Sequence, residues 1–255
     1  MANRFLRKAG ASEIVRKLTA KAVLEYSLIA EGDRILIAAS GGKDSTVMAW
    51  ALAQLRRGLG RSFDLAALHI SGDFDSCYGN PALGQRLAEW DIPFTDLFVP
   101  IAGRLKEGRK MNCYWCSTQR RTELLKYAVE NGFNKIALGH HLDDIVETFF
   151  MNLCLHGEMK AMPLLLAYRK YPVSLIRPLG YLEERQIIAC AEEKDILKSA
   201  STCPHGLASK RRDMRGRIAA FTGGSGAVKR RILTALDAEG LLSENEERED
   251  FTQSS

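Results

Sequence analysis

The sequence predicts an α/β fold in which a parallel β-sheet carries helices on both faces. Three observations indicate this class. Short apolar runs typical of buried strands alternate along the chain with longer segments whose apolar residues recur at helical spacing. The residues with the richest chemistry directly follow the runs that predict strands, which is where ligands bind in such folds. The 255 residues, 46% hydrophobic and 26% charged, have the composition of an ordinary soluble globular domain.

The first predicted elements alternate without exception. Arg34–Ala39 is a short apolar run, which indicates a buried strand. The next segment, Asp44–Arg57, carries apolar residues at helical spacing and is expected to be a helix. Phe63–Ile70 is rich in apolar residues and predicts the second strand. Pro81–Trp90 then predicts a helix, and Phe94–Val99 predicts a third strand.

The same alternation continues in the second half of the chain. Ser117–Glu130 is expected to be a helix, because Asn131-Gly132 is a pair that commonly ends one. Lys135–Gly139 predicts a fourth strand, and Asp143–Leu155 predicts a helix with an apolar side. The last predicted elements are a strand at Val173–Ile176 and a helix at Glu183–Lys194. We expect the crossovers to be right-handed, since parallel strands joined by helices nearly always are.

The segment Ser40–Ser45, with the sequence S-G-G-K-D-S, lies between the first predicted strand and its helix. Two glycines allow a tight turn and a close approach of the backbone to a ligand. The N-terminus of the following helix offers unpaired N–H groups and partial positive charge, to which Lys43 adds a cation. Asp44 is unusual at an anion site, and it could cap the helix or hold a Mg²⁺ ion that bridges phosphates. The segment therefore predicts a phosphate-binding loop.

This segment resembles the S-G-G-x-D-S signature of the PP-loop ATP pyrophosphatase superfamily, which has an adenine nucleotide alpha hydrolase-like fold. Members adenylate a substrate and release pyrophosphate. The resemblance implies that the loop holds the phosphates of ATP, and that the end of the second strand lines the adenine pocket. The implied ATP-binding residues are Ala39, Ser40, Gly41, Gly42, Lys43, Asp44, Ser45, His69 and Gly139.

Three of the six cysteines are candidate ligands in predicted loops: Cys113 and Cys116, which form a C-x-x-C pair, and Cys203. Three interpretations are open. A structural zinc site needs four ligands, with His205 as a candidate fourth. A redox dithiol would use the pair alone, and an iron–sulfur cluster would use three thiolates and leave one iron open. The pair by itself does not choose among them. Cys154 and Cys190, by contrast, lie among apolar residues and are expected to be buried, and Cys77 is ambiguous between a sulfur relay and an incidental loop thiol.

The combination of motifs is more specific. The phosphate loop, the C-x-x-C pair, the segment Gly139–Thr148 (G-H-H-L-D-D-I-V-E-T), Arg177-Pro178-Leu179 and Cys203 occur in this order. The chain, from about Glu31 to Arg217, thereby resembles the tRNA 2-thiocytidine synthetases, the cytidine-32 2-sulfurtransferases.

That resemblance implies a cofactor, a reaction and partners. Cys113, Cys116 and Cys203 would ligate a [4Fe–4S] cluster. ATP, with Mg²⁺, would adenylate the C2 oxygen of an anticodon-loop cytidine in tRNA, and a sulfide on the open iron would then displace AMP. Lys43, Asp44 and Asp144 are the implied catalytic residues, while Asp143 could simply cap the following helix. A cysteine desulfurase as sulfur donor and a homodimer are further expectations.

Positive charge is concentrated in two stretches, of which the first is residues 1–30, although the net charge is only +5. The second, Ala208–Arg231, contains Lys210, Arg211, Arg212 and Arg215, which follow Cys203 and are the candidate tRNA-binding residues. Basic residues at helical spacing also occur on ordinary solvated helix faces, so charge alone leaves both interpretations open.

The expected organisation has three parts. Residues 1–30 form a basic helical extension, residues 31–220 the PP-loop catalytic domain with its iron–sulfur site, and residues 221–255 a C-terminal extension with an acidic, disordered tail. We expect a cytoplasmic protein that does not enter a membrane, because no apolar run approaches the ~20 residues that a membrane span needs. Two other functions are considered: a PP-loop enzyme that thiolates uridine or uses a structural zinc, and a non-catalytic redox-sensing RNA-binding protein.

Overall fold

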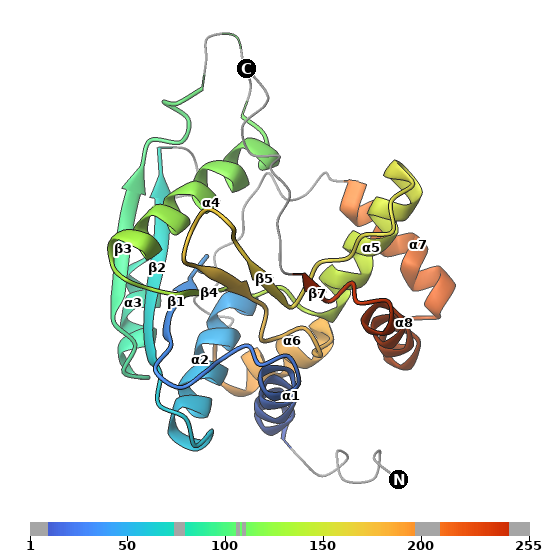
Figure 1. The fold of residues 1–255 in the computed structure, drawn as a ribbon, viewed down its shortest axis with the longest axis horizontal. Coiled ribbons are helices and arrows are strands. Elements are labelled where there is room, and N and C mark those ends of the chain that lie inside the picture. Colours follow the sequence, from blue (N-terminus) through green and yellow to red (C-terminus); the bar gives the residue numbers. More distant parts are fainter. Residues whose placement is uncertain (1–9, 74–79, 106–107, 109–110, 197–209, 245–255) are drawn as a thin grey trace.

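The computed structural model describes residues 10–73, 80–105, 108, 111–196 and 210–244 (Figure 1). The helices are α1 (Ala11–Glu25), α2 (Lys43–Gly58), α3 (Pro81–Ala88), α4 (Cys113–Glu130), α5 (Leu142–His156), α6 (Glu184–Glu193), α7 (Lys210–Thr222) and α8 (Gly226–Ala238). The strands are β1 (Arg34–Ala38), β2 (Asp64–Gly72), β3 (Phe94–Val99), β4 (Lys135–Ala137), β5 (Leu165–Ala167), β6 (Ser174–Ile176) and β7 (Ser243–Glu244). None of the described helices is both long and apolar enough to cross a bilayer.

The strands form one sheet in the order β3-β2-β1-β4-β6-β5-β7. Strands β3, β2, β1, β4 and β6 are parallel, as the alternation of strands and helices predicts. Strand β5 runs antiparallel to β6, and β7 pairs with β5. Neither β5 nor β7 was predicted, because no helix separates β5 from β6 and β7 has only two residues, so the alternation of strands and helices does not indicate them.

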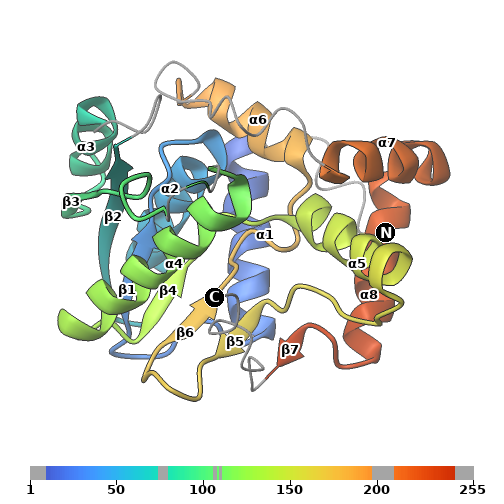
Figure 2. The same ribbon diagram turned by 90° about the horizontal axis from the view of Figure 1, so that it is seen from above.

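Both faces of the sheet are covered, as predicted. Alternate residues of β1 point to opposite faces: Ile35 and Ile37 pack with the apolar residues of α1, α2 and α6, and Leu36 packs with those of α4. Figure 2 shows α5, α7 and α8 gathered beside this sheet rather than over it. Helices α7 and α8 lie in a region for which the sequence analysis proposes no individual elements.

Three helix starts differ from expectation. The N-cap of α2 is Gly42 and not Asp44, and the N-cap of α5 is His141 and not Asp143. Helix α4 begins at Cys113 rather than at Ser117, because the Asn112 side chain caps it by accepting a hydrogen bond from the Trp115 N–H at 2.9 Å. The C-x-x-C pair therefore belongs to the first turn of α4 and not to the loop before it.

Two cysteine predictions can also be compared with the structure. Cys190 is buried, as expected, whereas Cys154 is exposed near the C-terminal end of α5. The prediction for Cys154 was wrong because its apolar neighbours Leu153 and Leu155 are themselves exposed there.

Asp73, directly after β2, fastens the turn that follows β3. Its carboxylate accepts hydrogen bonds from the N–H groups of Ala102 and Gly103, both at 2.7 Å. Desolvation would raise the pKa of Asp73, but these two donors outweigh it and hold the pKa below its ordinary value. The ionised carboxylate therefore stabilises the fold above its ordinary pKa, and this contribution is lost as the pH falls through the lowered folded-state value.

We therefore expect Asp73→Asn to be less stable than the wild type at neutral pH. The difference in unfolding free energy between the two proteins should become smaller as the pH falls from about 5 to about 2. The measurement is urea unfolding at several pH values. Asp64→Asn, at the exposed start of the same strand, is the control and should have a stability close to that of the wild type at neutral pH. A gap for Asp73→Asn that stays constant across this pH range would contradict the assignment.

Candidate active site

The loop between β1 and α2 has the geometry of an anion cradle. Gly41 has a φ of +79°, a left-handed conformation that favours glycine, and Gly42 is the extended N-cap of α2. Ser40 braces the turn, since its hydroxyl lies 3.0 Å from the Ser45 hydroxyl and accepts a hydrogen bond from the Gly42 N–H at 3.3 Å. The first-turn N–H groups of α2 have no intrahelical acceptors and point toward this loop. The loop can thus bind phosphate oxygens with backbone donors.

Gly139 follows β4 and lies directly against this loop. A Cβ atom at Gly139 would lie 3.0 Å from the backbone nitrogen of Ser45 and 3.2 Å from the carbonyl carbon of Asp44. The obstruction is backbone, which a side-chain rotation cannot relieve. The structure therefore brings together the predicted loop and Gly139, although they are far apart in the sequence.

Lys43 is held by two carboxylates. Its Nζ lies 3.2 Å from each carboxylate oxygen of Asp44 and 2.9 Å from Oε1 of Glu184, at the start of α6. Partial burial would raise the pKa of Glu184, but the ammonium of Lys43 and the guanidinium of Arg215 outweigh it and hold that pKa below its ordinary value. Glu184 is therefore ionised at neutral pH beside the phosphate loop.

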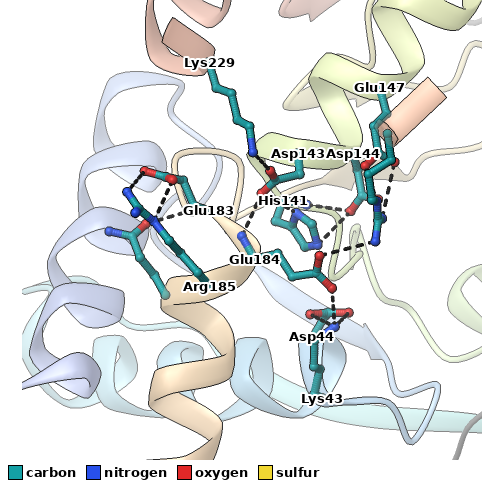
Figure 3. A network of polar contacts seen from close by, with 12 residues as sticks. Lys43, Asp44, His141, Asp143, Asp144, Glu147, Glu183, Glu184, Arg185 and Lys229 are labelled. Atoms are coloured by element: carbon teal, nitrogen blue, oxygen red, sulfur yellow. Dashed lines mark hydrogen bonds and ion pairs between the residues drawn. The ribbon is translucent and has the colours of Figure 1, made fainter. Parts of the chain in front are cut away.

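The N-terminus of α5 carries a buried imidazole between two carboxylates (Figure 3). His141 Nδ1 lies 3.5 Å from Asp143, and Nε2 lies 3.4 Å from Asp144, whose carboxylate also accepts the His141 N–H at 3.1 Å. Burial favours the neutral ring, but the surrounding aspartates outweigh it and raise the pKa of His141 above its ordinary value. The Asp143 carboxylate has two further partners. It accepts a hydrogen bond from the backbone N–H of Glu184 at 2.7 Å and pairs with Lys229 of α8.

Carboxylates neutralise much of the basic stretch that was predicted to bind tRNA. Arg215 Nε lies 2.6 Å from the buried Glu147, and Arg215 Nη1 lies 3.3 Å from Glu184. Arg217, Lys229 and Arg230 have carboxylate partners as well. The side chains of Lys210, Arg211 and Arg212 lie outside the described residues, although their backbone begins α7. A role of these residues in tRNA binding stays a prediction.

His69 lies near the end of β2 beside the same loop and is 4% exposed. Its Nδ1 lies 2.7 Å from the carbonyl oxygen of Ala39, a distance at which Nδ1–H donates. Among the described residues, the buried Nε2 has no hydrogen-bond partner. A buried acceptor without a donor is costly, so the environment of His69 fits an amino-bearing ligand such as adenine.

The cysteine constellation is only partly described. Cys116 is half-buried in the first turn of α4, where the helix N-terminus favours a thiolate. The Cys113 side chain, Cys77 and Cys203 lie outside the described residues, so the meeting of three thiolates stays a prediction. Within the described part of the chain, no three His, Cys, Asp or Glu side chains converge on a metal position, and Mg²⁺ likewise stays a prediction.

Two residues of the site escaped the sequence analysis. Glu184 has no motif around it, and only its place at the start of α6 brings it to Lys43, 141 positions earlier in the chain. Lys229 looked like part of a basic surface, yet it pairs with Asp143. Glu147, which lies in the predicted helix at residues 143–155, is buried and paired with Arg215.

Comparisons with known proteins agree with this geometry. A family model described as the PP-loop domain matches residues 12–198. A "tRNA-cytidine(32) 2-sulfurtransferase" of Legionella pneumophila is 39% identical over 194 residues, covering 72% of this chain and 66% of that protein. A protein of the same name from Dichelobacter nodosus is 35% identical over 207 residues, covering 80% of this chain and 76% of that protein. The chain thus spans just under two thirds of the Legionella relative.

The fold has a solved counterpart. The structure described as "U34-tRNA thiolase NcsA from Methanococcus maripaludis with its [4Fe-4S] cluster" superposes with a TM-score of 0.71 and 24% sequence identity, covering 93% of this chain and 82% of that one. At this identity the likeness supports the parallel-sheet fold and nothing finer.

Proposed function

This chain belongs to the tRNA-cytidine(32) 2-sulfurtransferase family of PP-loop proteins, and from that premise we propose that it is an ATP-dependent tRNA sulfurtransferase. Its substrate would be a cytidine of the anticodon loop, converted to 2-thiocytidine. The observation that carries the proposal is the glycine loop after β1, braced by Ser40 and Ser45 and pressed against Gly139. A triphosphate fits such a loop because backbone donors and the helix N-terminus both favour negative charge.

ATP would bind across the C-terminal edge of the sheet. The first-turn N–H groups of α2 and the ammonium of Lys43 would bind the phosphates, and His69 Nε2 would accept a hydrogen bond from the adenine amino group. The nearby Asp44 and Asp144 are the proposed residues for Mg²⁺, since both are carboxylates at this edge. The buried His69 acceptor would favour adenine over guanine, because guanine presents a carbonyl oxygen where adenine presents an amino group.

The proposed chemistry has two displacements. The C2 oxygen of cytosine attacks the α-phosphorus of ATP, and pyrophosphate leaves with the electron pair of the broken P–O bond. Sulfide then attacks C2; a C–S bond forms, the C–O bond breaks and AMP leaves. Adenylation is needed because the base oxygen is a poor leaving group, and Lys43 and the loop amides would stabilise the charge that gathers on the phosphates.

Cys113, Cys116 and Cys203 are the proposed ligands of a [4Fe–4S] cluster. Cys116 is the one of these three whose side chain the structure describes, and its position suits an iron ligand. It is half-buried at a helix N-terminus that favours its thiolate. A cluster with three protein ligands supplies an iron that can present sulfide to the activated base. The sulfide would come from a cysteine desulfurase.

Two measurements test the function. Protein purified without oxygen should contain iron and acid-labile sulfide in equal amounts, and stoichiometric zinc without iron would overturn the cluster. Nucleoside analysis of tRNA from a strain lacking the gene should show the loss of 2-thiocytidine. Loss of a thiolated uridine instead would reassign the substrate.

Replacing Cys116 with serine is expected to abolish tRNA thiolation while ATP binding stays within about twofold of the wild type, because the hydroxyl is a far weaker iron ligand than a thiolate. The measurements are thiolation of tRNA, iron content and ATP affinity on the same preparation. Cys154→Ser, at an exposed position on α5, is the matched control and should keep full activity. The ligand assignment fails if Cys116→Ser retains both iron and activity.

A further inference from the structure

Glu184 is a carboxylate shared between the phosphate loop and a distant helix. One oxygen, Oε1, binds Lys43 Nζ at 2.9 Å, and the other, Oε2, lies 3.3 Å from Arg215 Nη1 on α7. The backbone of Glu184 is held in place as well, because its N–H donates a hydrogen bond to the Asp143 carboxylate at 2.7 Å. Figure 3 shows the side chain reaching from α6 down toward Lys43 and Asp44.

The arrangement sets a competition for Lys43. Its ammonium is paired with Asp44 and Glu184, and a phosphate bound at the loop would compete with both carboxylates for it. Asp44 is its neighbour in the chain and moves with it, so Glu184 is the partner that Lys43 leaves. A half-buried carboxylate left without a cation near phosphates would be repelled by them.

Arg215 is placed to prevent that outcome. Its Nε and Nη2 contact the buried carboxylate of Glu147 at 2.6 and 3.4 Å, which ties the guanidinium to α5. The remaining Nη1 faces Glu184. Since the planar guanidinium can serve both carboxylates at once, Glu184 keeps a counter-charge after Lys43 has gone.

We propose that Glu184 is a positioning residue for Lys43, and that Arg215 on α7 sets how readily Glu184 releases the Lys43 ammonium to the phosphates of ATP. This proposal rests on the proposed nucleotide site. Helix α7, which was predicted to meet tRNA, is thereby connected to the nucleotide loop through one carboxylate. Arg215 acts on ATP without touching it.

A double-mutant cycle on ATP affinity tests this. We expect Arg215→Gln to weaken ATP binding about tenfold, within the range of measured couplings between contacting residues. Glu184→Gln is expected to bind ATP as tightly as the wild type or a few-fold more tightly, because the competing charge is gone. In the double variant Glu184→Gln with Arg215→Gln, the loss caused by Arg215→Gln should shrink to less than about twofold. The probe is ATP with Mg²⁺ in titration calorimetry on the full chain.

The cycle separates the proposal from its rivals. If Arg215 contacts the phosphates itself, its replacement weakens binding equally in both backgrounds, and the proposal is wrong. If Glu184 holds the nucleotide's metal, Glu184→Gln weakens binding, which also overturns it. Arg217→Gln is the matched control, since Arg217 lies on the same helix, pairs only at the surface with Asp213 at 3.0 Å, and should not alter ATP affinity.

Arg215→Gln leaves the buried Glu147 with a weaker partner and could unfold the protein, which thermal unfolding would reveal. In that case Arg215→Lys takes the place of Arg215→Gln in the cycle. Lysine keeps the positive charge beside Glu147 but lacks the planar guanidinium that contacts the carboxylates of both Glu147 and Glu184. A wild-type chain that binds no ATP would refute the proposed function. A chain that binds ATP with an additive cycle would refute only the role of Glu184.

Discussion

Replacing Lys43 with methionine is expected to lower ATP-dependent tRNA thiolation by about 100- to 1,000-fold, the usual cost of losing one donor to charge that develops in a transition state. Methionine keeps the unbranched apolar stem and removes only the ammonium. Without that cation, the phosphates lose a positive charge at a loop that also holds the carboxylates of Asp44 and Glu184. The measurement is the single-turnover rate of thiolation with saturating ATP.

The matched control is Lys126→Met, since Lys126 lies on α4, is 57% exposed and pairs with Glu123 at 3.5 Å. Its rate should stay within about twofold of the wild type, because exposed ion pairs contribute little. A Lys43→Met enzyme whose rate is close to that of the control would show that the ammonium does not act on the reacting phosphates.

Replacing Gly139 with alanine is expected to weaken ATP binding by tenfold or more and to cost about 1–3 kcal/mol of unfolding free energy, the usual penalty of an added methyl group in a packed site. The new Cβ would lie 3.0 Å from the Ser45 nitrogen and 3.1 Å from its Cα, so the first turn of α2 must move. That turn supplies the proposed phosphate donors, which links the stability cost to the binding cost. Urea unfolding and ATP titration measure the two.

Gly58→Ala provides the control within the helix that begins at this loop. Gly58 is the last residue of α2, and in the described part of the chain a Cβ there would meet no heavy atom within 4 Å apart from its chain neighbours and the nearby backbone of its own helix. Alanine there should leave ATP affinity unchanged and keep or slightly raise stability, since alanine is the better helix former. An equal effect of both substitutions would contradict the close approach of Gly139 to the loop.

The parallel core of the fold was predictable because its signals are local. The predicted strands at residues 34–39, 63–70, 94–99 and 135–139 all have counterparts in β1 to β4, and the helices between them begin and end within a few residues of expectation. Strands β5 and β7 were not predicted, since no helix separates β5 from β6 and β7 has only two residues. Strand β5 pairs with β6, and β7 pairs with β5.

The candidate site divides in the same way. The loop Ser40–Ser45 is recognisable because glycines, hydroxyls and a lysine must lie together in the sequence to form one turn. Asp44 and Asp143 were considered as possible helix caps, but Gly42 and His141 hold these positions, because a side chain suited to capping does not reveal which backbone torsions its residue adopts. The exposure of Cys154 was missed because apolar neighbours do not show where a helix leaves the core.

The amino-acid order alone determined that this protein has a parallel sheet with a glycine-rich anion loop after its first strand, because strand periodicity and turn chemistry are properties of adjacent residues. Only the tertiary structure decided which charges meet at that loop. Glu184 reaches Lys43, and Arg215 and Lys229 turn inward to Glu147 and Asp143, because α5, α6, α7 and α8 converge at one end of the sheet. An ion pair forms between residues that the folded backbone brings together, and no pattern of neighbouring residues in the sequence indicates which residues those are.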